Sequence, residues 1–354
     1  MSDSQFDALL VLSFGGPEGE DEVIPFLENV TRGRGIPRER LAEVGEHYFN
    51  FGGVSPINGQ NREIIANLEA AIADRGDELP VYFGNRNWHP FAADAVDQIA
   101  ADGHKHVAVF ATSAWGGYSA CRQYDEDIVK LREVHPEIEF TKLWQFYGHP
   151  TFIKLMADQV RAAWESADQK STRVLFAAHS VPNAADDASG GPTDQNLYSR
   201  QVAEASRLIA LEAGVPDYEV VWQSRSGDPR TPWLEPDVVD RTEEIDDAGE
   251  GVKHIICVPV GFITDHMEVI WDLDTELKEA CEERGITLTR TPTVGLDPVF
   301  AQLILDLLDN TAAGTEPESL STITVQGCTL NGAPCKEGCC APQRPKPAAA
   351  APAS

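Results

Sequence analysis

The stretches RVLFAAHSVP at residues 173–182 and HIICVPVGFITDHME at residues 254–268 decide the fold of this chain. In each, an apolar run of strand length leads into a loop that contains proline or glycine. Such runs predict buried strands, and ligands of open α/β sheets bind at the carboxyl ends of strands. His179 follows the first run, and Glu268 follows the second. An imidazole and a carboxylate at strand ends suit a divalent metal ion or a proton transfer.

Strand-like runs and amphipathic stretches alternate along most of the chain, which predicts β-α units with parallel sheets and an α/β fold class. We expect two doubly wound domains, residues 1–147 and 148–290, and then a helix within 291–312 that packs back on the first domain. Residues 313–341 form a cysteine-rich tail, and the Pro/Ala-rich residues 342–354 are expected to be disordered. Predicted strands lie at 8–14, 80–84, 106–112, 140–143, 173–178, 219–223, 254–260 and 287–291, and predicted helices at 20–30, 37–50, 60–74, 91–102, 121–134, 151–166, 195–213, 267–284 and 298–310.

The chain is strongly acidic, with 28 Lys and Arg against 57 Asp and Glu and a formal net charge of −29. This charge repels nucleic acid and anionic membrane surfaces. No apolar run reaches the roughly 18 residues of a membrane span, and the start of the chain does not have the pattern of a secretory leader. We therefore expect a cytoplasmic protein that has no membrane span and does not bind nucleic acid. We also expect it to be a monomer. An anionic ligand would need a local cluster of basic residues.

Three carboxylates share one face of the helix predicted at 267–284. Glu268, Asp272 and Glu276 follow one another at intervals of four residues, which aligns them on a helix. A solvated acidic face is the ordinary explanation of such spacing. The apolar residues between them indicate that much of the helix is buried, and like charges in a buried place raise one another's pKa. The alternative is therefore a ladder that passes metal ions or protons.

Two loops of the first domain could form walls of a ligand site. Arg32 and Arg34 lie in the short basic segment TRGRG, and forked guanidinium groups suit carboxylate or phosphate. Residues 49–56, FNFGGVSP, combine aromatic side chains, glycines and a hydroxyl, as expected for the wall of a flat apolar site or for a tight loop. The glycine-rich segment after the first strand, residues 13–19, lacks the dinucleotide fingerprint.

Cysteines crowd near the C-terminal end of the chain. Cys328, Cys335, Cys339 and Cys340 fall within a short segment rich in glycine and proline. In a cytoplasmic protein such a group indicates zinc or an iron–sulfur cluster, and the spacing alone leaves both possible. Cys121 is a candidate for a distant fourth ligand.

Six motifs in order resemble those of the ferrochelatase family, in particular the coproporphyrin ferrochelatases of Gram-positive bacteria. The resemblance runs from about residue 9 to residue 310, and the cysteine tail extends it. It implies two Rossmann-like domains with a porphyrin cleft between them, and a lyase that inserts Fe²⁺ into coproporphyrin III in haem biosynthesis. The motifs are LSFGGP at 12–17, GGVSP at 52–56, AHSVP at 178–182, VWQSR at 221–225, PWL at 232–234, and DHME at 265–268 with WDLD at 271–274.

The same resemblance implies roles for single residues. His179 and Glu268 would bind the incoming Fe²⁺ and act in catalysis, while Ser55 and Tyr124 would contact the porphyrin. Phe14 stands where many relatives carry a tyrosine that approaches the metal from the opposite face, and it offers no ligand atom. In relatives that carry a cluster it is of the 2Fe–2S type. The implied ligands here are Cys121, Cys328, Cys335 and Cys340, with Cys339 as the alternate to Cys340.

Other functions remain open at this point. A protoporphyrin ferrochelatase would use the same residues, and so would a chelatase that inserts cobalt or nickel into another tetrapyrrole, because a His/Glu pair does not select the metal. A haem-binding or iron–sulfur sensor is the alternative without catalysis. For the coproporphyrin enzyme the partners would be coproporphyrin III, ferrous iron and a downstream enzyme that receives coprohaem. Arg32 and Arg34 are our candidates for binding the propionates.

Overall fold

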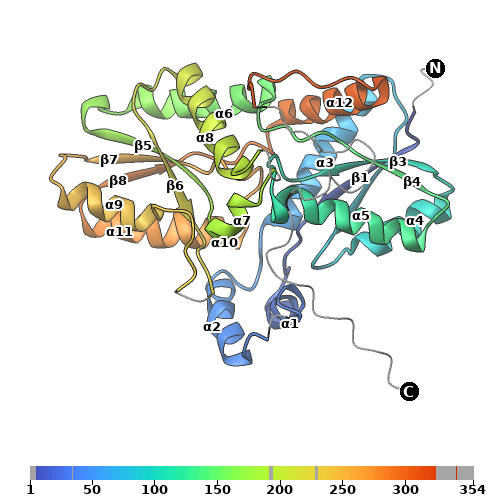
Figure 1. The fold of residues 1–354 in the computed structure, drawn as a ribbon, viewed down its shortest axis with the longest axis horizontal. Coiled ribbons are helices and arrows are strands. Elements are labelled where there is room, and N and C mark those ends of the chain that lie inside the picture. The colour runs from blue at the N-terminus through green and yellow to red at the C-terminus, as the bar shows by residue number, and fades with distance from the viewer. Residues whose placement is uncertain (1–4, 34, 191–193, 228–229, 324–339, 341–354) are drawn as a thin grey trace.

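Two four-stranded parallel sheets form the framework of this computed structural model, in which residues 5–33, 35–190, 194–227, 230–323 and 340 are described. We call the parts built on them the N-terminal and C-terminal halves, which lie side by side in Figure 1. The N-terminal sheet has the order β2-β1-β3-β4 and the C-terminal sheet the order β6-β5-β7-β8. The strands are β1 (Ala8–Ser13), β2 (Val81–Asn85), β3 (His106–Ala111), β4 (Glu139–Lys142), β5 (Thr172–His179), β6 (Glu219–Gln223), β7 (His254–Val258) and β8 (Thr287–Arg290).

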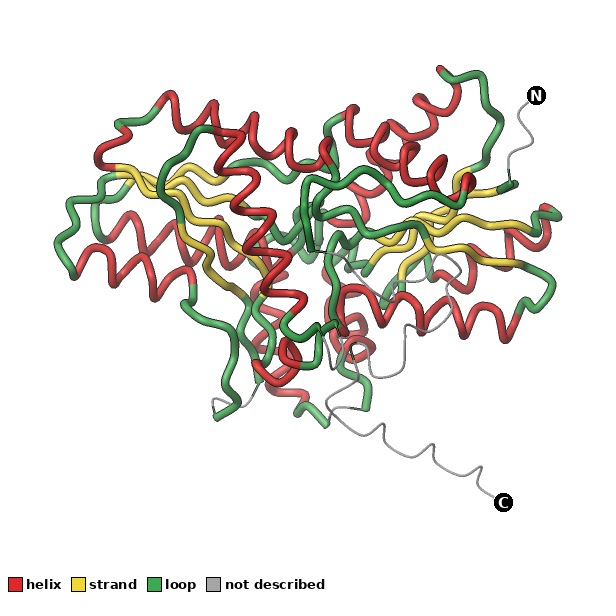
Figure 2. Tube along the Cα trace, turned by 45° about the horizontal axis from the view of Figure 1, so that its top comes forward, coloured by secondary structure: helices red, strands yellow, loops and turns green. Residues whose placement is uncertain are grey.

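Helices cover both faces of each sheet (Figure 2). The central strands are therefore largely apolar, and every residue of β1 is buried. The helices are α1 (Glu20–Val30), α2 (Arg38–Phe49), α3 (Ile57–Asp74), α4 (Ala92–Asp102), α5 (Gln123–Val134), α6 (Pro150–Ser166), α7 (Asn183–Asp187), α8 (Leu197–Ala213), α9 (Val238–Asp247), α10 (Met267–Trp271), α11 (Lys278–Glu283) and α12 (Pro298–Ala313), with π-helical turns at Tyr118–Arg122 and Asp272–Leu277 and a short 3₁₀ turn at Gln169–Ser171.

The predicted α/β class with two parallel sheets is confirmed. Each of the eight predicted strands is present, with its ends shifted by no more than two residues. The two sheets also share one strand order, in which the first strand of the half lies between the second and the third. The strand order therefore reverses between β1 and β3 and again between β5 and β7. Such reversal points are where open α/β sheets bind their ligands.

Helix prediction was less complete. The stretch 267–284, predicted as one helix, is divided into α10, a π-helical turn and α11. A π-helical turn holds an extra residue, so it changes which side chains share a face. The helix α9 was missed, although Asp237 caps its first turn by accepting from Val239 N–H at 2.9 Å. The five-residue helix α7 is too short to give a periodic signal.

The last helix lies against the N-terminal half (Figure 1). It contacts α3 from the beginning of the chain and α6 from the middle. Phe300, Leu303, Ile304 and Leu307 of α12 are fully buried in one hydrophobic cluster that also contains core residues of α3, β3 and β5. The two halves therefore share a continuous apolar core beneath the loops at the ends of their strands.

Candidate active site

His179 is the last residue of β5, at the point where the C-terminal sheet reverses its strand order. Its Nδ1 lies within hydrogen-bonding distance of the carbonyl oxygen of Ser180. An N–H at Nδ1 therefore donates to this carbonyl, which directs Nε2 toward the site. The hydroxyl of Tyr198 donates to the carbonyl oxygen of His179 at 2.8 Å and holds the backbone from the other side.

Glu268 lies in the first turn of α10, after the loop that follows β7. Its Oε2 is 3.4 Å from Nε2 of His179, and the side chains retain 52% and 35% exposure respectively. The loop passes close to β5 at Gly261, where an added Cβ would lie 2.9 Å from the Cα of Ala178. Glycine at this position therefore allows the two strand ends, and with them the two side chains, to approach each other.

The pair is an ion pair when no metal is bound. Burial disfavours the charged imidazole, but the Glu268 carboxylate outweighs this effect and raises the pKa of His179. Burial likewise disfavours the Glu268 carboxylate, yet His179 lowers its pKa below the usual range. Burial lowers the pKa of His266, which stands 4.0 Å from Glu268, so this ring stays neutral. At neutral pH the pair therefore holds a proton on His179.

Asp272 stands next along the predicted ladder. Its Oδ2 accepts hydrogen bonds from the hydroxyl of Ser224 and, at 3.3 Å, from Nε2 of Gln223. The same Gln223 amide donates to the carbonyl oxygen of Glu268 at 3.0 Å. Burial raises the pKa of Asp272 to about 7, and the Glu268 and Glu276 carboxylates add to the rise while Ser224 opposes it. A carboxyl with this pKa can gain or lose a proton near neutral pH.

Glu276 is exposed, whereas Asp272 between it and Glu268 is half-buried. Its pKa is also raised, first by burial and then by neighbouring carboxylates, against a hydrogen bond from Trp271. Asp272 and Glu276 belong to the π-helical turn and do not follow Glu268 in regular α-helical register. The carboxylates nevertheless interact with one another through space, as the repulsion between them indicates.

Exposed apolar side chains mark the N-terminal half of the site. Phe14 follows β1 at the reversal point of the N-terminal sheet, and Phe51 and Val54 lie in the loop before α3. They are 42%, 40% and 44% exposed. Ser55 N–H donates to the carbonyl oxygen of Pro17 at 2.8 Å, so the two loops are bound to each other. Residues predicted to wall a flat apolar ligand therefore present an uncovered surface.

The other predicted porphyrin contacts are less open. Ser55 is buried behind Gly16. Tyr124 is buried in the hydrophobic core beneath the N-terminal sheet, with the guanidinium of Arg86 5.0 Å from its ring centre. Arg32 is exposed to solvent, and Arg34 lies outside the described residues.

Contacts from the N-terminal half hold the loop between β7 and α10, and the sequence analysis missed the residues that make them. The indole nitrogen of Trp115 donates to the carbonyl oxygen of Gly261 at 2.8 Å. The amide of Gln60 on α3 pairs with Asp265. Trp115 follows β3, so the rule that ligands lie at strand ends could have found it. Gln60 gave no such signal.

Helix α2 also reaches the C-terminal half. The ring of His47 stacks on the indole of Trp271 with centroids 3.9 Å apart and planes inclined by 7°. Burial raises the pKa of Tyr48, and the nearby Glu268 carboxylate adds to the effect. This aromatic contact therefore joins α2 to the helix that carries Glu268.

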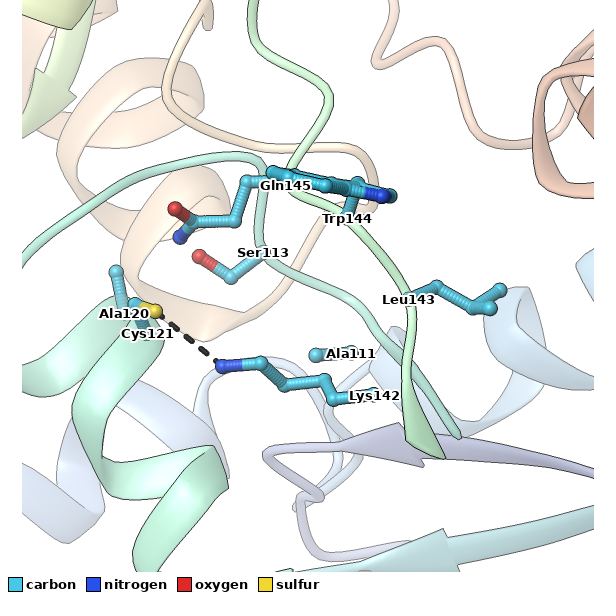
Figure 3. Close-up of a pocket in the computed structure, with 8 residues that line it drawn as sticks. All are labelled: Ala111, Ser113, Ala120, Cys121, Lys142, Leu143, Trp144 and Gln145. Carbon is cyan, nitrogen blue, oxygen red and sulfur yellow. Dashed lines mark hydrogen bonds between the residues drawn. The ribbon is translucent and has the colours of Figure 1, made fainter. Parts of the chain in front are cut away.

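Cys121 faces a buried ion pair. Figure 3 shows its sulfur close to the ammonium of Lys142, and Nζ donates to Sγ at 3.3 Å. Nζ of Lys142 is also 2.6 Å from a carboxylate oxygen of Asp125, and both of these side chains are almost wholly buried. A cavity of about 10 Å³ adjoins them, lined also by Ser113 and Gln145.

Cys340 is buried as well, and its sulfur accepts from the backbone N–H of Gly190 at 3.5 Å. Both described cysteines of the predicted cluster thus receive a hydrogen bond on sulfur, as thiolate ligands of iron–sulfur clusters do. Their environments fit such a role. Cys328, Cys335 and Cys339 lie outside the described residues, and among those described no three His, Cys, Asp or Glu side chains gather as a metal site.

Comparison with known proteins connects this geometry to a chemistry. Residues 6–312 match the protein family described as Ferrochelatase. The chain is 56% identical over 342 residues to a coproporphyrin III ferrochelatase of Corynebacterium glutamicum strain R, covering 95% of this chain and 92% of that protein. It is 54% identical over 350 residues to a coproporphyrin III ferrochelatase of Nocardia farcinica, covering 97% of this chain and 99% of that protein.

Solved structures with a similar fold include two of the sirohydrochlorin chelatase SirB from Bacillus subtilis. One is a complex with cobalt, with a TM-score of 0.52 at 13% identity, covering 87% of this chain and 95% of that chain. The other contains Fe³⁺ and has a TM-score of 0.53 at 12% identity, covering 88% of this chain and 99% of that chain. At these identities the likeness concerns the fold alone. Within the described part of the chain, no helix is long and apolar enough to cross a membrane.

Proposed function

Because the chain belongs to the ferrochelatase family, we propose that it inserts Fe²⁺ into coproporphyrin III, a lyase reaction that releases two protons and gives coprohaem. The observation that carries this proposal is the pair of His179 Nε2 and Glu268 Oε2, 3.4 Å apart at the reversal point of the C-terminal sheet. An imidazole and a carboxylate that retain exposure can bind a divalent cation and receive protons.

Iron enters on the face of His179 and Glu268. Because Ser180 O engages Nδ1, Nε2 is the nitrogen left for the metal, and it must first lose the proton that Glu268 stabilises. Iron binding therefore releases a proton, as is general for metal ligands that start out protonated. Phe14 on the opposite half has no ligand atom, so we propose that no side chain at that position binds the metal from the other face.

The ring must give up two pyrrole protons as it accepts Fe²⁺. We propose that the neutral His179 imidazole or the Asp272 carboxylate takes them, since the pKa of Asp272 is raised to about 7. Glu276, more exposed than Asp272, would pass protons onward to solvent or deliver hydrated iron inward. The short path from Asp272 through Ser224 and Gln223 keeps this carboxyl beside Glu268.

The porphyrin would lie in a cleft between the halves, against Phe14, Phe51 and Val54. Exposed apolar side chains in two connected loops suit a flat macrocycle. Ser55 and Tyr124 would contact the porphyrin once these loops adjust, and Arg32 and Arg34 would meet propionates at the rim. Guanidinium groups are needed there because the chain as a whole carries −29 and repels the four propionates.

We further propose that Cys121, Cys328, Cys335 and Cys340 hold a 2Fe–2S cluster, with Cys339 as the alternate to Cys340. Support comes from Lys142 and from Gly190 N–H, which donate to the sulfurs of Cys121 and Cys340. When bound, such a cluster supplies a one-electron couple and a tether between the tail and the π-helical turn before α5, and the insertion itself needs no change of oxidation state. Purified protein should be coloured with the cluster and colourless with zinc.

We also propose that the protein is a cytoplasmic monomer. It would transfer coprohaem to a downstream enzyme. Thiol ligands remain reduced in the cytoplasm, which supports that location.

The function is tested by anaerobic insertion of Fe²⁺, followed by absorbance, with coproporphyrin III and protoporphyrin IX offered separately. Turnover of coproporphyrin III alone is expected. Preference for protoporphyrin IX would contradict the substrate but retain the chelatase chemistry. Tight binding of both porphyrins without turnover would contradict the enzymatic function.

A further inference from the structure

The loop between β7 and α10 leads into the helical turn that carries Glu268, and the N-terminal half fixes this loop at two points. Trp115 donates to the carbonyl oxygen of Gly261 at the start of the loop. Gln60 contacts Asp265 near its end, three residues before Glu268. The loop therefore takes its position from both halves of the molecule.

The contact of Gln60 with Asp265 is a two-way pair. The backbone N–H of Asp265 donates to Oε1 of Gln60 at 2.7 Å, and Nε2 of Gln60 donates to Oδ2 of Asp265 at 3.4 Å. A primary amide supplies the acceptor and the donor from one rigid plane. A side chain of different length or chemistry would lose one or both bonds.

Asp265 is also hydrogen-bonded within the C-terminal half. Arg290 from the end of β8 donates to its Oδ1 at 3.1 Å, and Thr293 donates to the same atom at 3.2 Å. The fork of Arg290 also binds both carboxylate oxygens of Asp274, at 2.9 and 2.7 Å. This network ties the start of α10 to the π-helical turn that follows it. A displacement of Gln60 would therefore move the loop and α10 as one body.

Gln60 also lies next to the loop against which the porphyrin would rest. It belongs to the first turn of α3, which follows directly on the loop that holds Phe51, Val54 and Ser55. The porphyrin would rest on that loop, whereas the iron would bind His179 and Glu268. Gln60 thus links the loop proposed to contact the porphyrin to the loop that precedes Glu268.

We infer that Gln60 is a positioning residue for metal insertion, which sets the height of Glu268 over the bound ring through Asp265. Insertion requires the metal to come within bonding reach of the pyrrole nitrogens, and a misplacement of 1 Å can cost about 100-fold in rate. Gln60 touches neither iron nor porphyrin in this role, which rests on the proposed chelatase function.

The test replaces Gln60 by methionine, which keeps the length of the side chain and removes its amide. We expect Gln60→Met to lower kcat for coproporphyrin III at least about tenfold, with the porphyrin KM and the spectrum of bound porphyrin unchanged. Gln60→Glu keeps an acceptor for Asp265 N–H and should recover part of the lost kcat.

Asn67 provides the matched control. It lies on the same helix, and its Nδ2 donates to the carbonyl oxygen of Leu296 at 3.2 Å and not to Asp265. Asn67→Leu should lower Tm as much as Gln60→Met does and leave kcat near that of the unmodified chain. An unchanged kcat in Gln60→Met, or an equal loss in both variants, overturns the inference alone. Absence of insertion by the unmodified chain overturns the proposed function and the inference together.

Discussion

His179 derives its properties from where its strand ends and from what lies beside it. The Ser180 carbonyl sets the orientation of the ring, and Glu268 sets its charge. In the proposed mechanism Nε2 is then the atom that exchanges a proton for a metal ion. Because protons compete with iron at this atom, iron binding should weaken as pH falls.

Replacement of His179 by alanine should abolish insertion and leave porphyrin binding largely intact. In the proposed mechanism His179 supplies the metal ligand and a proton acceptor, and general base catalysis alone contributes about 10²–10⁴ in rate. The measurement is single-turnover insertion together with the fluorescence of bound porphyrin. If His179→Ala instead lost porphyrin binding, and still inserted iron into the porphyrin that it does bind, the imidazole would be structural.

Asp272 should make the stability of the protein depend on pH. Its pKa is raised from 3.8 to about 7 in the folded chain, so the folded state binds more protons than the unfolded state between about pH 4 and 7. Stability is therefore lost as pH rises through this window. Asp272→Asn removes the ionised form and should raise Tm more at pH 8 than at pH 5. A Tm difference that is equal at the two pH values would contradict the raised pKa.

At the scale of elements, β4 and α5 are joined by a buried ion pair. Lys142→Met would remove the ammonium that lies 2.6 Å from the buried Asp125 carboxylate, and removing one partner of such a pair costs roughly 3–5 kcal/mol. Denaturant unfolding should show this loss. Lys154→Met is the control, because the Lys154–Asp158 pair on α6 is exposed and such pairs contribute roughly 0.3–0.5 kcal/mol. Similar losses of unfolding free energy in the two variants would mean that the buried Lys142 pair stabilises the fold no more than an exposed pair does.

Elements with a strong local signal were predicted best. β5 and β7 are continuous apolar runs because helices cover both faces of their sheet, and a run of that kind is visible in the sequence alone. Because these two runs are visible in the sequence, the positions of His179 and Glu268 after them could be predicted. The π-helical turn after Trp271 was not foreseen, since it depends on tertiary contacts and not on the spacing of apolar residues.

Residues that act across the two halves were the hardest to foresee. Gln60 and Asp265 are about two hundred positions apart, and neither has an unusual neighbourhood in the sequence. Tyr124 shows the converse, because a residue marked by resemblance as a ligand contact is buried in the core. Local patterns thus indicate which groups are available, while packing decides which of them meet.

At the scale of the whole molecule, the net charge of −29 should act on the substrate. Coproporphyrin carries four propionates, so the long-range field opposes its approach. Raising the salt concentration from 0.01 to 0.15 M shortens the Debye length from about 30 to about 8 Å. We therefore expect kcat/KM for coproporphyrin III to increase over this range, measured at constant pH in a non-chelating salt. A decrease would indicate that local arginines dominate the encounter.

The packing of α12 on α3 also affects how the chain folds during its synthesis. Chains are synthesised from the N-terminus at roughly 5–20 residues per second, so α3 leaves the ribosome on the order of ten seconds or more before its partner exists. During that interval the surface of Ile64, Leu68 and Ile72 that α12 later buries stays exposed. The first half cannot therefore reach its final form as an independent cotranslational unit. Nascent chains released before α12 should be bound by chaperones, and complete chains should escape them.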